Sequence, residues 1–200
     1  MNKKFDSKKI SKKEMLSYLN ESSEIALFQL ELIDTIKKAS EICIDTLNNG
    51  GKIIFCGNGG SASDSQHLAA ELVGRFMKNR APIAAISINT DTSVLTSISN
   101  DFGYKYVFSK QIEAIGNVND ILFLLSTSGK SENIIEAGNK AKEMGLKVIC
   151  MTGKNIDKLK NISDVTLSIP SEIPGIVQQS HITIGQLICM NIENSITLIN

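Results

Sequence analysis

The chain of 200 residues contains no tryptophan, and aromatic residues make up only 5% of it. Surfaces that stack single-stranded bases need aromatic side chains, so we expect no such surface here. Net charge is also missing, because 21 Lys and Arg balance 21 Asp and Glu. No overall positive field is therefore present to hold nucleic acid directly. A local group of lysines, which we interpret as a solvated head rather than a binding arm, comprises Lys3, Lys4, Lys8, Lys9, Lys12 and Lys13.

Long apolar runs and paired cysteines are absent as well. No uninterrupted apolar stretch approaches the ~20 residues of a membrane helix, and the N-terminus lacks the apolar segment of a secretory signal. Cys43, Cys56, Cys150 and Cys189 form no Cys-x-x-Cys pair. This spacing favours small buried apolar residues in a reducing compartment. We therefore predict a cytoplasmic protein without membrane contact.

Hydrophobic periodicity predicts alternating helices and strands. Apolar residues step by three or four from Ile25 to Leu47, which indicates a long amphipathic helix within residues 21–48. Unbroken apolar runs predict strands at residues 53–56, 83–88, 121–125, 148–151 and 165–169. Helical patterns follow at residues 61–77, with Ser61 and Asp64 spaced as a capping box, and at 104–115, 132–144 and 176–199. The order predicts one three-layer α/β domain over residues 1–200 with a five-stranded parallel sheet. Residues 1–20 would be a head that is loose, or helical only in an oligomer.

A glycine-rich loop, residues 57–61 (GNGGS), joins the first predicted strand to a helix. Glycines let the backbone approach a ligand closely, and a helix N-terminus offers free N–H groups, so the loop favours phosphate or another anion. The alternative is a tight turn without a ligand. Gly57, Gly59 and Ala62 also fit the dinucleotide fingerprint, but that motif needs an acidic residue about 20 residues further on. Asp91 lies much further along the chain, so we disfavour dinucleotide binding.

A serine-rich loop, residues 126–131 (STSGKS), follows the most apolar predicted strand. Its end resembles a P-loop, but Leu124 stands where that motif requires its first glycine, which excludes a nucleotide triphosphate site. Four hydroxyl groups and a glycine at a helix start suit a single phosphate. The alternative is a serine-rich cap turn.

Two histidines lie on predicted helices. His67 and Glu71 are four residues apart and share one helix face, where they could transfer a proton, bind a metal, or simply form a hydrogen-bonded pair. His181 follows Gln178 in the last helix and sits on its apolar stripe, so a core histidine is favoured over a ligand or base. A third polar cluster, Asp91 to Ser93 with a predicted turn at residues 100–103, favours turn chemistry over a ligand site when it is taken apart from the other two loops.

Several motifs in the same order resemble the phosphoheptose isomerases of the sugar isomerase (SIS) superfamily, from about residue 45 to the end. They are Cys56–Ala62, Gln66-His67, Ala70–Leu72, Gly74–Phe76, Asn100–Tyr104, Phe108-Ser109 and Ser126–Gly129. The resemblance implies a flavodoxin-like SIS fold and the conversion of sedoheptulose 7-phosphate to D-glycero-D-manno-heptose 7-phosphate for lipopolysaccharide or capsule heptose. It also implies zinc, and a homotetramer with active sites at subunit contacts, to which the 21–48 helix would contribute.

The resemblance also assigns roles to individual residues. Glu71 would be the base that transfers a proton between neighbouring carbons, and it would need a raised pKa to act near neutrality. Metal positions correspond to His67, Glu71 and Gln178. Substrate contacts would come from Asn58, Gly59, Gly60, Glu71, Asn100, Asp101, Ser126, Thr127, Ser128, Ser131 and Gln178.

One position departs from the family pattern. The family places a second histidine, a metal ligand and acid–base partner, eight residues after Gln178, where this chain has Gln186. Glutamine exchanges no proton near neutral pH and is a weak zinc ligand. His181 lies about 140° away around the helix and is no simple replacement. Three hypotheses stay open. The protein could be an isomerase that uses Glu71 together with water or a substrate group, or an enzyme for another phosphosugar. It could also be a non-catalytic module that binds protein partners, as one relative in the family binds the bacterial replication initiator.

Overall fold

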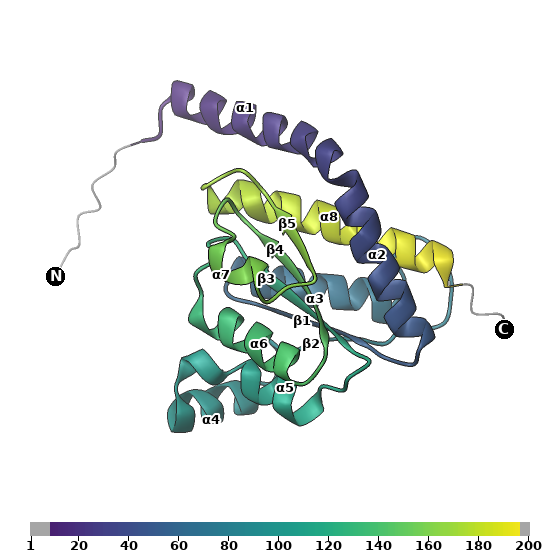
Figure 1. Ribbon diagram of the computed structural model, residues 1–200. Helices are drawn as coiled ribbons and strands as arrows, with labels where there is room; N and C mark the ends of the chain where they lie inside the picture. The colour runs from purple at the N-terminus through teal and green to yellow at the C-terminus, as the bar shows by residue number, and fades with distance from the viewer. Residues whose placement is uncertain (1–8, 197–200) are drawn as a thin grey trace.

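The computed structural model describes residues 9–196 and contains the predicted five-stranded parallel sheet (Figure 1). The strand order is β2-β1-β3-β4-β5 and all four pairings are parallel. The strands are β1 (Ile53–Gly57), β2 (Ala85–Ser87), β3 (Ile121–Ser126), β4 (Lys147–Thr152) and β5 (Val165–Ser168). The predicted fold class is confirmed. The apolar runs of β1 and β3 are buried throughout, as strands covered on both faces must be.

Helices cover both faces of the sheet. Ile53 and Phe55 of β1 face a core formed with α2 (Ile33–Asn48), α3 (Gly60–Val73) and α8 (Pro174–Ser195). Ile54 and Cys56 face the opposite core, which contains α5 (Ser109–Ile115), α6 (Glu132–Glu143) and α7 (Asp157–Lys160). This alternation follows from the period of two in a strand. All four cysteines are free and buried, which confirms their prediction as core residues.

The predicted N-terminal helix is two helices joined by a 3₁₀ turn. Helix α1 (Lys12–Phe28) begins with a capping box between Ser11 and Glu14, and η1 (Gln29–Leu32) connects it to α2. Residues 12–20 of the predicted head are thus helical, while Lys3, Lys4 and Lys8 lie outside the described residues. Helix α1 extends beyond the sheet (Figure 1). It buries only Ile25 of its own residues, and its exposed apolar residues are Met15, Leu16, Leu19 and Leu27.

Three local predictions were wrong. Helix α4 (Thr92–Phe102) replaces the turn at residues 100–103, and α5 is shorter than predicted because η2 (Tyr104–Tyr106) precedes it. Asp91 starts α4 by accepting a hydrogen bond from the Val94 N–H at 3.0 Å. The pattern concealed α4 because many of its residues are Ser and Thr, which have weak helix propensity. Helix α3 has Gly59 as N-cap and no side-chain cap, so the capping box at Ser61 and Asp64 does not form.

Other helix boundaries differ by a few residues. Helix α3 ends at Val73, with Gly74 as its C-cap, rather than at residue 77, and α8 ends at Ser195 within the described range. Among residues 9–196, none of the helices combines the length and the apolar character that a bilayer crossing requires.

Candidate active site

The sheet brings the two predicted ligand loops together. Strand order reverses between β1 and β3, and such a switch point opens a crevice at the carboxyl ends of the two strands. Gly57 at the end of β1 pairs with Leu125 near the end of β3. The glycine-rich loop and the serine-rich loop, far apart in the sequence, therefore leave the sheet side by side.

The glycine-rich loop requires its glycines. Gly59 has a φ of +57°, a left-handed conformation that favours glycine, and a Cβ atom at Gly60 would overlap the side-chain amide of Gln178. Gln178 of α8 is thus held against the loop by close packing. This contact brings together two of the predicted substrate residues.

Asn58 is fixed by neighbours from two other segments. Its amide exchanges hydrogen bonds with the amide of Asn133 at 2.8 and 2.9 Å, and its Oδ1 accepts a bond from the Tyr104 hydroxyl at 3.0 Å. Neither Asn133 nor Tyr104 was a predicted site residue. Tyr104 belongs to the Asn100–Tyr104 motif, which was the available signal, whereas Asn133 follows the serine-rich loop by two residues and had none.

The serine-rich loop presents hydroxyl groups that the fold leaves largely unused. Ser126 Oγ is buried and has no hydrogen-bond partner within the described chain. Ser131 is the N-cap of α6, yet its side chain makes no capping hydrogen bond. Gly129 has a φ of +63°, and a Cβ there would overlap the Asn155 carbonyl, so the loop is tightly turned. Unused hydroxyls beside the free N–H groups of a helix start are suited to an anion.

An open cavity of about 430 Å³ lies against this loop. Its lining includes Thr127, Ser128 and two lysines, Lys130 and Lys154, together with the carboxylates of Asp157 and Glu172. Lys154 lies 3.6 Å from Glu172, so the cavity has no excess of positive charge.

His67, Glu71 and Gln186 form a compact polar cluster between α3 and α8. His67 Nε2 lies 2.8 Å from Glu71 Oε1, and Gln186 Nε2 lies 3.3 Å from His67 Nε2 and 3.5 Å from Glu71 Oε1. The Glu71 side chain is 17% exposed, while that of His67 is 51% exposed. Glu71 is thus a mostly buried carboxylate that keeps a path to solvent, as a base that reaches a substrate requires.

His181 lies on the opposite side of α8, as its spacing from Gln186 predicted. Its side chain is fully buried, which confirms a core histidine. Burial lowers the pKa of His181 to about 4, and the nearby Thr152 backbone offsets this only in part. Neither ring nitrogen reaches hydrogen-bonding geometry with any residue from 9 to 196. His181 is therefore a neutral core residue at physiological pH.

Among the described residues, neither Asn100 nor Asp101 forms a hydrogen bond with the glycine-rich loop or the serine-rich loop. Both are exposed in the last turn of α4, where the Asn100 amide donates to Asp101 at 2.8 Å. Only the neighbouring Tyr104 connects this segment to Asn58. Their predicted substrate contact stays a prediction.

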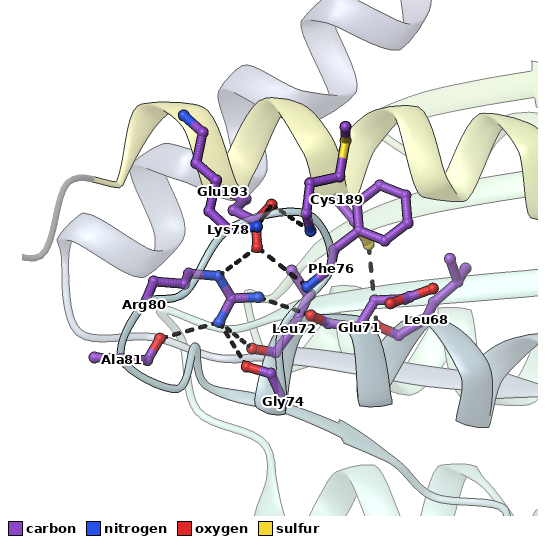
Figure 2. Close-up of polar contacts among 11 residues, drawn as sticks. Leu68, Glu71, Leu72, Gly74, Phe76, Lys78, Arg80, Ala81, Cys189 and Glu193 are labelled. Atoms are coloured by element: carbon purple, nitrogen blue, oxygen red, sulfur yellow. Dashed lines mark hydrogen bonds and ion pairs between the residues drawn. The ribbon is translucent and has the colours of Figure 1, made fainter.

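A buried ion pair fastens the end of α3 to α8 (Figure 2). Glu193 accepts hydrogen bonds from Arg80 and from the backbone N–H groups of Phe76, Met77 and Lys78. Arg80 donates in turn to backbone carbonyls, including that of Glu71 at 2.7 Å. Sequence reasoning missed this pair. The sequence did contain a signal for this pair. Apart from His181, Glu193 is the only acidic or basic residue in helix α8, and a single carboxylate in an apolar helix needs a partner.

The residues at the predicted metal site do not fit zinc. Among residues 9–196, no three His, Cys, Asp or Glu side chains gather closely enough to hold a metal ion. The additional candidates, Gln178 and Gln186, offer only amide groups, which are poor zinc ligands. The pair of His67 and Glu71 by itself is too small a donor set for a structural or catalytic zinc site.

Comparisons with known proteins agree with this fold. A family model described as SIS domain matches residues 17–153. A phosphoheptose isomerase from Helicobacter pylori is 45% identical over 182 residues, which cover 91% of this chain and 93% of that protein. A phosphoheptose isomerase structure from Neisseria gonorrhoeae has a TM-score of 0.85 at 38% identity, covering 91% of this chain and 98% of that one. Another from Francisella tularensis has a TM-score of 0.88 at 33% identity, covering 93% and 100%.

A five-stranded parallel sheet with two polar loops at its switch-point crevice defines a three-layer α/β domain. The chain belongs to the SIS domain family and, within it, to the phosphoheptose isomerases, a family of phosphosugar-isomerising enzymes.

Proposed function

We propose that this protein interconverts sedoheptulose 7-phosphate and D-glycero-D-manno-heptose 7-phosphate in the cytoplasm, to supply heptose for lipopolysaccharide or capsule. The observation that carries the proposal is the position of Glu71. It lies on the helix that starts at the glycine-rich loop, it is mostly buried, and it accepts a 2.8 Å hydrogen bond from His67. The relatives named phosphoheptose isomerase support the choice of substrate.

The serine-rich loop would hold the phosphate of the sugar. Ser126, Thr127, Ser128 and Ser131 surround the start of α6, where backbone N–H groups and the helix dipole favour an anion. Asn58, Gly59, Gly60 and Gln178 would contact the sugar chain between the two ends.

Isomerisation moves one hydrogen between C1 and C2 through an enediol. Glu71 would take the proton from C1 of the ketose, the electron pair of that bond would form the C1–C2 double bond, and the C2 oxygen would gain a proton. The proton held by Glu71 would then return to C2, while the hydroxyl group on C1 loses its proton and becomes the aldehyde carbonyl. Transfer between the two oxygens falls to water or the substrate, since Gln186 cannot exchange a proton near neutral pH.

We further propose that the protein works as a homotetramer. Apolar side chains of α1 are exposed along the part of the helix that extends beyond the domain, among them Leu19 at 60% and Leu27 at 68%. A groove between α2 and α8, whose apolar lining includes Ile33, Ile44 and Leu187, is also open. Exposed patches of this kind are typical of subunit contacts. Light scattering at several protein concentrations tests the proposal, and a monomer throughout would reject it.

The activity is tested by adding sedoheptulose 7-phosphate and following aldose formation by NMR. We expect turnover by the wild type and loss of turnover in Glu71→Gln, which keeps the shape of the side chain but removes the base. Binding of the ketose phosphate without turnover by the wild type or by Gln186→His would favour the non-catalytic module, for which Gln186 is the supporting feature. A protein partner recovered by affinity capture would then identify its role.

A further inference from the structure

The hydrogens in the cluster of His67, Glu71 and Gln186 can be placed from the distances. A carboxylate only accepts hydrogen bonds, so the 2.8 Å contact to Glu71 Oε1 requires a proton on His67 Nε2. Gln186 Nε2 also carries hydrogens and lies 3.5 Å from the same oxygen, as a longer and weaker donor. The 3.3 Å separation between Gln186 Nε2 and His67 Nε2 is then the spacing of two donors that approach one acceptor.

Rotating the Gln186 amide would not improve this arrangement. Its Oε1 would then face the Glu71 carboxylate, and two acceptors would lie against each other without a hydrogen between them. The carboxylate therefore selects the amide N–H, as well as the His67 tautomer with the proton on Nε2. Nε2 is the ring atom directed at Glu71. In that tautomer Nε2 has no free lone pair with which to bind a metal.

We propose that Gln186 takes the place of a metal ion in this protein: its amide and His67 position Glu71 by two converging hydrogen bonds, without zinc. A divalent cation and a pair of N–H donors both hold a carboxylate in one orientation. The donors do so without a third His, Cys, Asp or Glu ligand, which this cluster lacks among the described residues. Gln186 is thus a positioning residue. This inference rests on the proposed isomerase function only for the catalytic role of Glu71, and the positioning of Glu71 by Gln186 and His67 does not depend on it.

Zinc affinity provides the first test. We would measure calorimetric zinc titrations and bound metal after dialysis for the wild type, Gln186→His and the control Gln179→His, which adds a histidine to an exposed position of the same helix. We expect the wild type and the control to retain no stoichiometric zinc, and Gln186→His to bind zinc at least ~10-fold more tightly. One tightly held zinc per wild-type chain, unchanged in Gln186→His, would overturn the proposal.

Nitrogen-15 NMR of the imidazole rings provides the second test. The chain has only two histidines, and His181 is buried in the core, so the signals of His67 can be assigned by comparison with a His181→Leu variant. We expect neutral His67 in the wild type to carry its proton on Nε2 and its spectrum to be unaffected by zinc. An unprotonated Nε2, or a large zinc-dependent shift in the wild type, would contradict the proposed hydrogen bonds.

Kinetics separate this proposal from the proposed function. If the protein is an isomerase, turnover should persist in chelator, and Gln186→Leu should lower kcat more than it raises KM, because the substrate contacts remain while Glu71 loses a donor. Turnover that stops in chelator and returns with zinc would reject the proposal while supporting the isomerase. No turnover under any condition would reject the isomerase, while the zinc and NMR results would still decide how the cluster is held.

Discussion

Replacing Glu193 by glutamine should destabilise this protein strongly, although Glu193 lies outside the proposed substrate contacts. The Glu193 carboxylate is almost completely buried and receives Arg80 together with the N–H groups of Phe76, Met77 and Lys78 (Figure 2). The variant keeps the size of the side chain but removes its charge and turns an amide NH₂ toward donors. Arg80, whose side chain is 7% exposed, is left as a buried charge without its counter-ion.

Removing one partner of a buried ion pair typically costs about 3–5 kcal/mol, because the remaining charge stays desolvated. For a chain of this size, 1 kcal/mol corresponds to roughly 2–4 °C in Tm, so the expected fall is on the order of 10 °C. The exposed pair of Lys140 and Glu143 offers a matched control, since the Glu143 side chain is 69% exposed. Glu143→Gln should change stability by less than about 1 kcal/mol.

The assay is urea and thermal unfolding of the wild type and both variants at pH 7 and one fixed protein concentration, because subunit association also contributes to stability. Hydrogen bonds and Arg80 hold the pKa of Glu193 below its ordinary value, against the opposing effect of burial. Its contribution should therefore be present above about pH 4.3, the ordinary Glu pKa, and be lost as the pH falls further. A Glu193→Gln variant as stable as the Glu143→Gln control would refute this account of the ion pair.

Two further outcomes are expected. Ser128→Ala combined with Ser131→Ala should weaken binding of the ketose phosphate at least several-fold, since each hydrogen bond to a charged group contributes ~1.5–3 kcal/mol, and calorimetry that finds unchanged affinity would place the phosphate elsewhere. His181→Leu should remove a pH dependence of stability. In the wild type the unfolded chain takes up a proton between pH 6.5 and about 4 while buried His181 does not, so up to about 3 kcal/mol is lost as the pH falls through this range. Equal pH profiles for the wild type and His181→Leu would show that His181 does not carry this effect.

The regular elements could be predicted where one physical signal dominated. The apolar runs of β1 and β3 are buried on both faces. This burial could be predicted from the sequence because every side chain within the two runs is hydrophobic. Helix α4 was missed because Ser and Thr have weak helix propensity, and only in the folded helix do hydroxyl groups such as those of Thr96 and Ser99 bond to the backbone carbonyl four residues earlier.

The sequence alone determined the alternation of strands and helices, and hence the parallel sheet with the glycine-rich and serine-rich loops at the carboxyl ends of β1 and β3. These features depend on local periodicity and on backbone freedom at particular glycines. Only the tertiary structure decided that Gln186 meets Glu71 across two helices and that Glu193 fastens the end of α3 through Arg80. Residues more than a hundred positions apart become neighbours through the packing of whole helices, and no local pattern in the sequence records which side chains then come into contact.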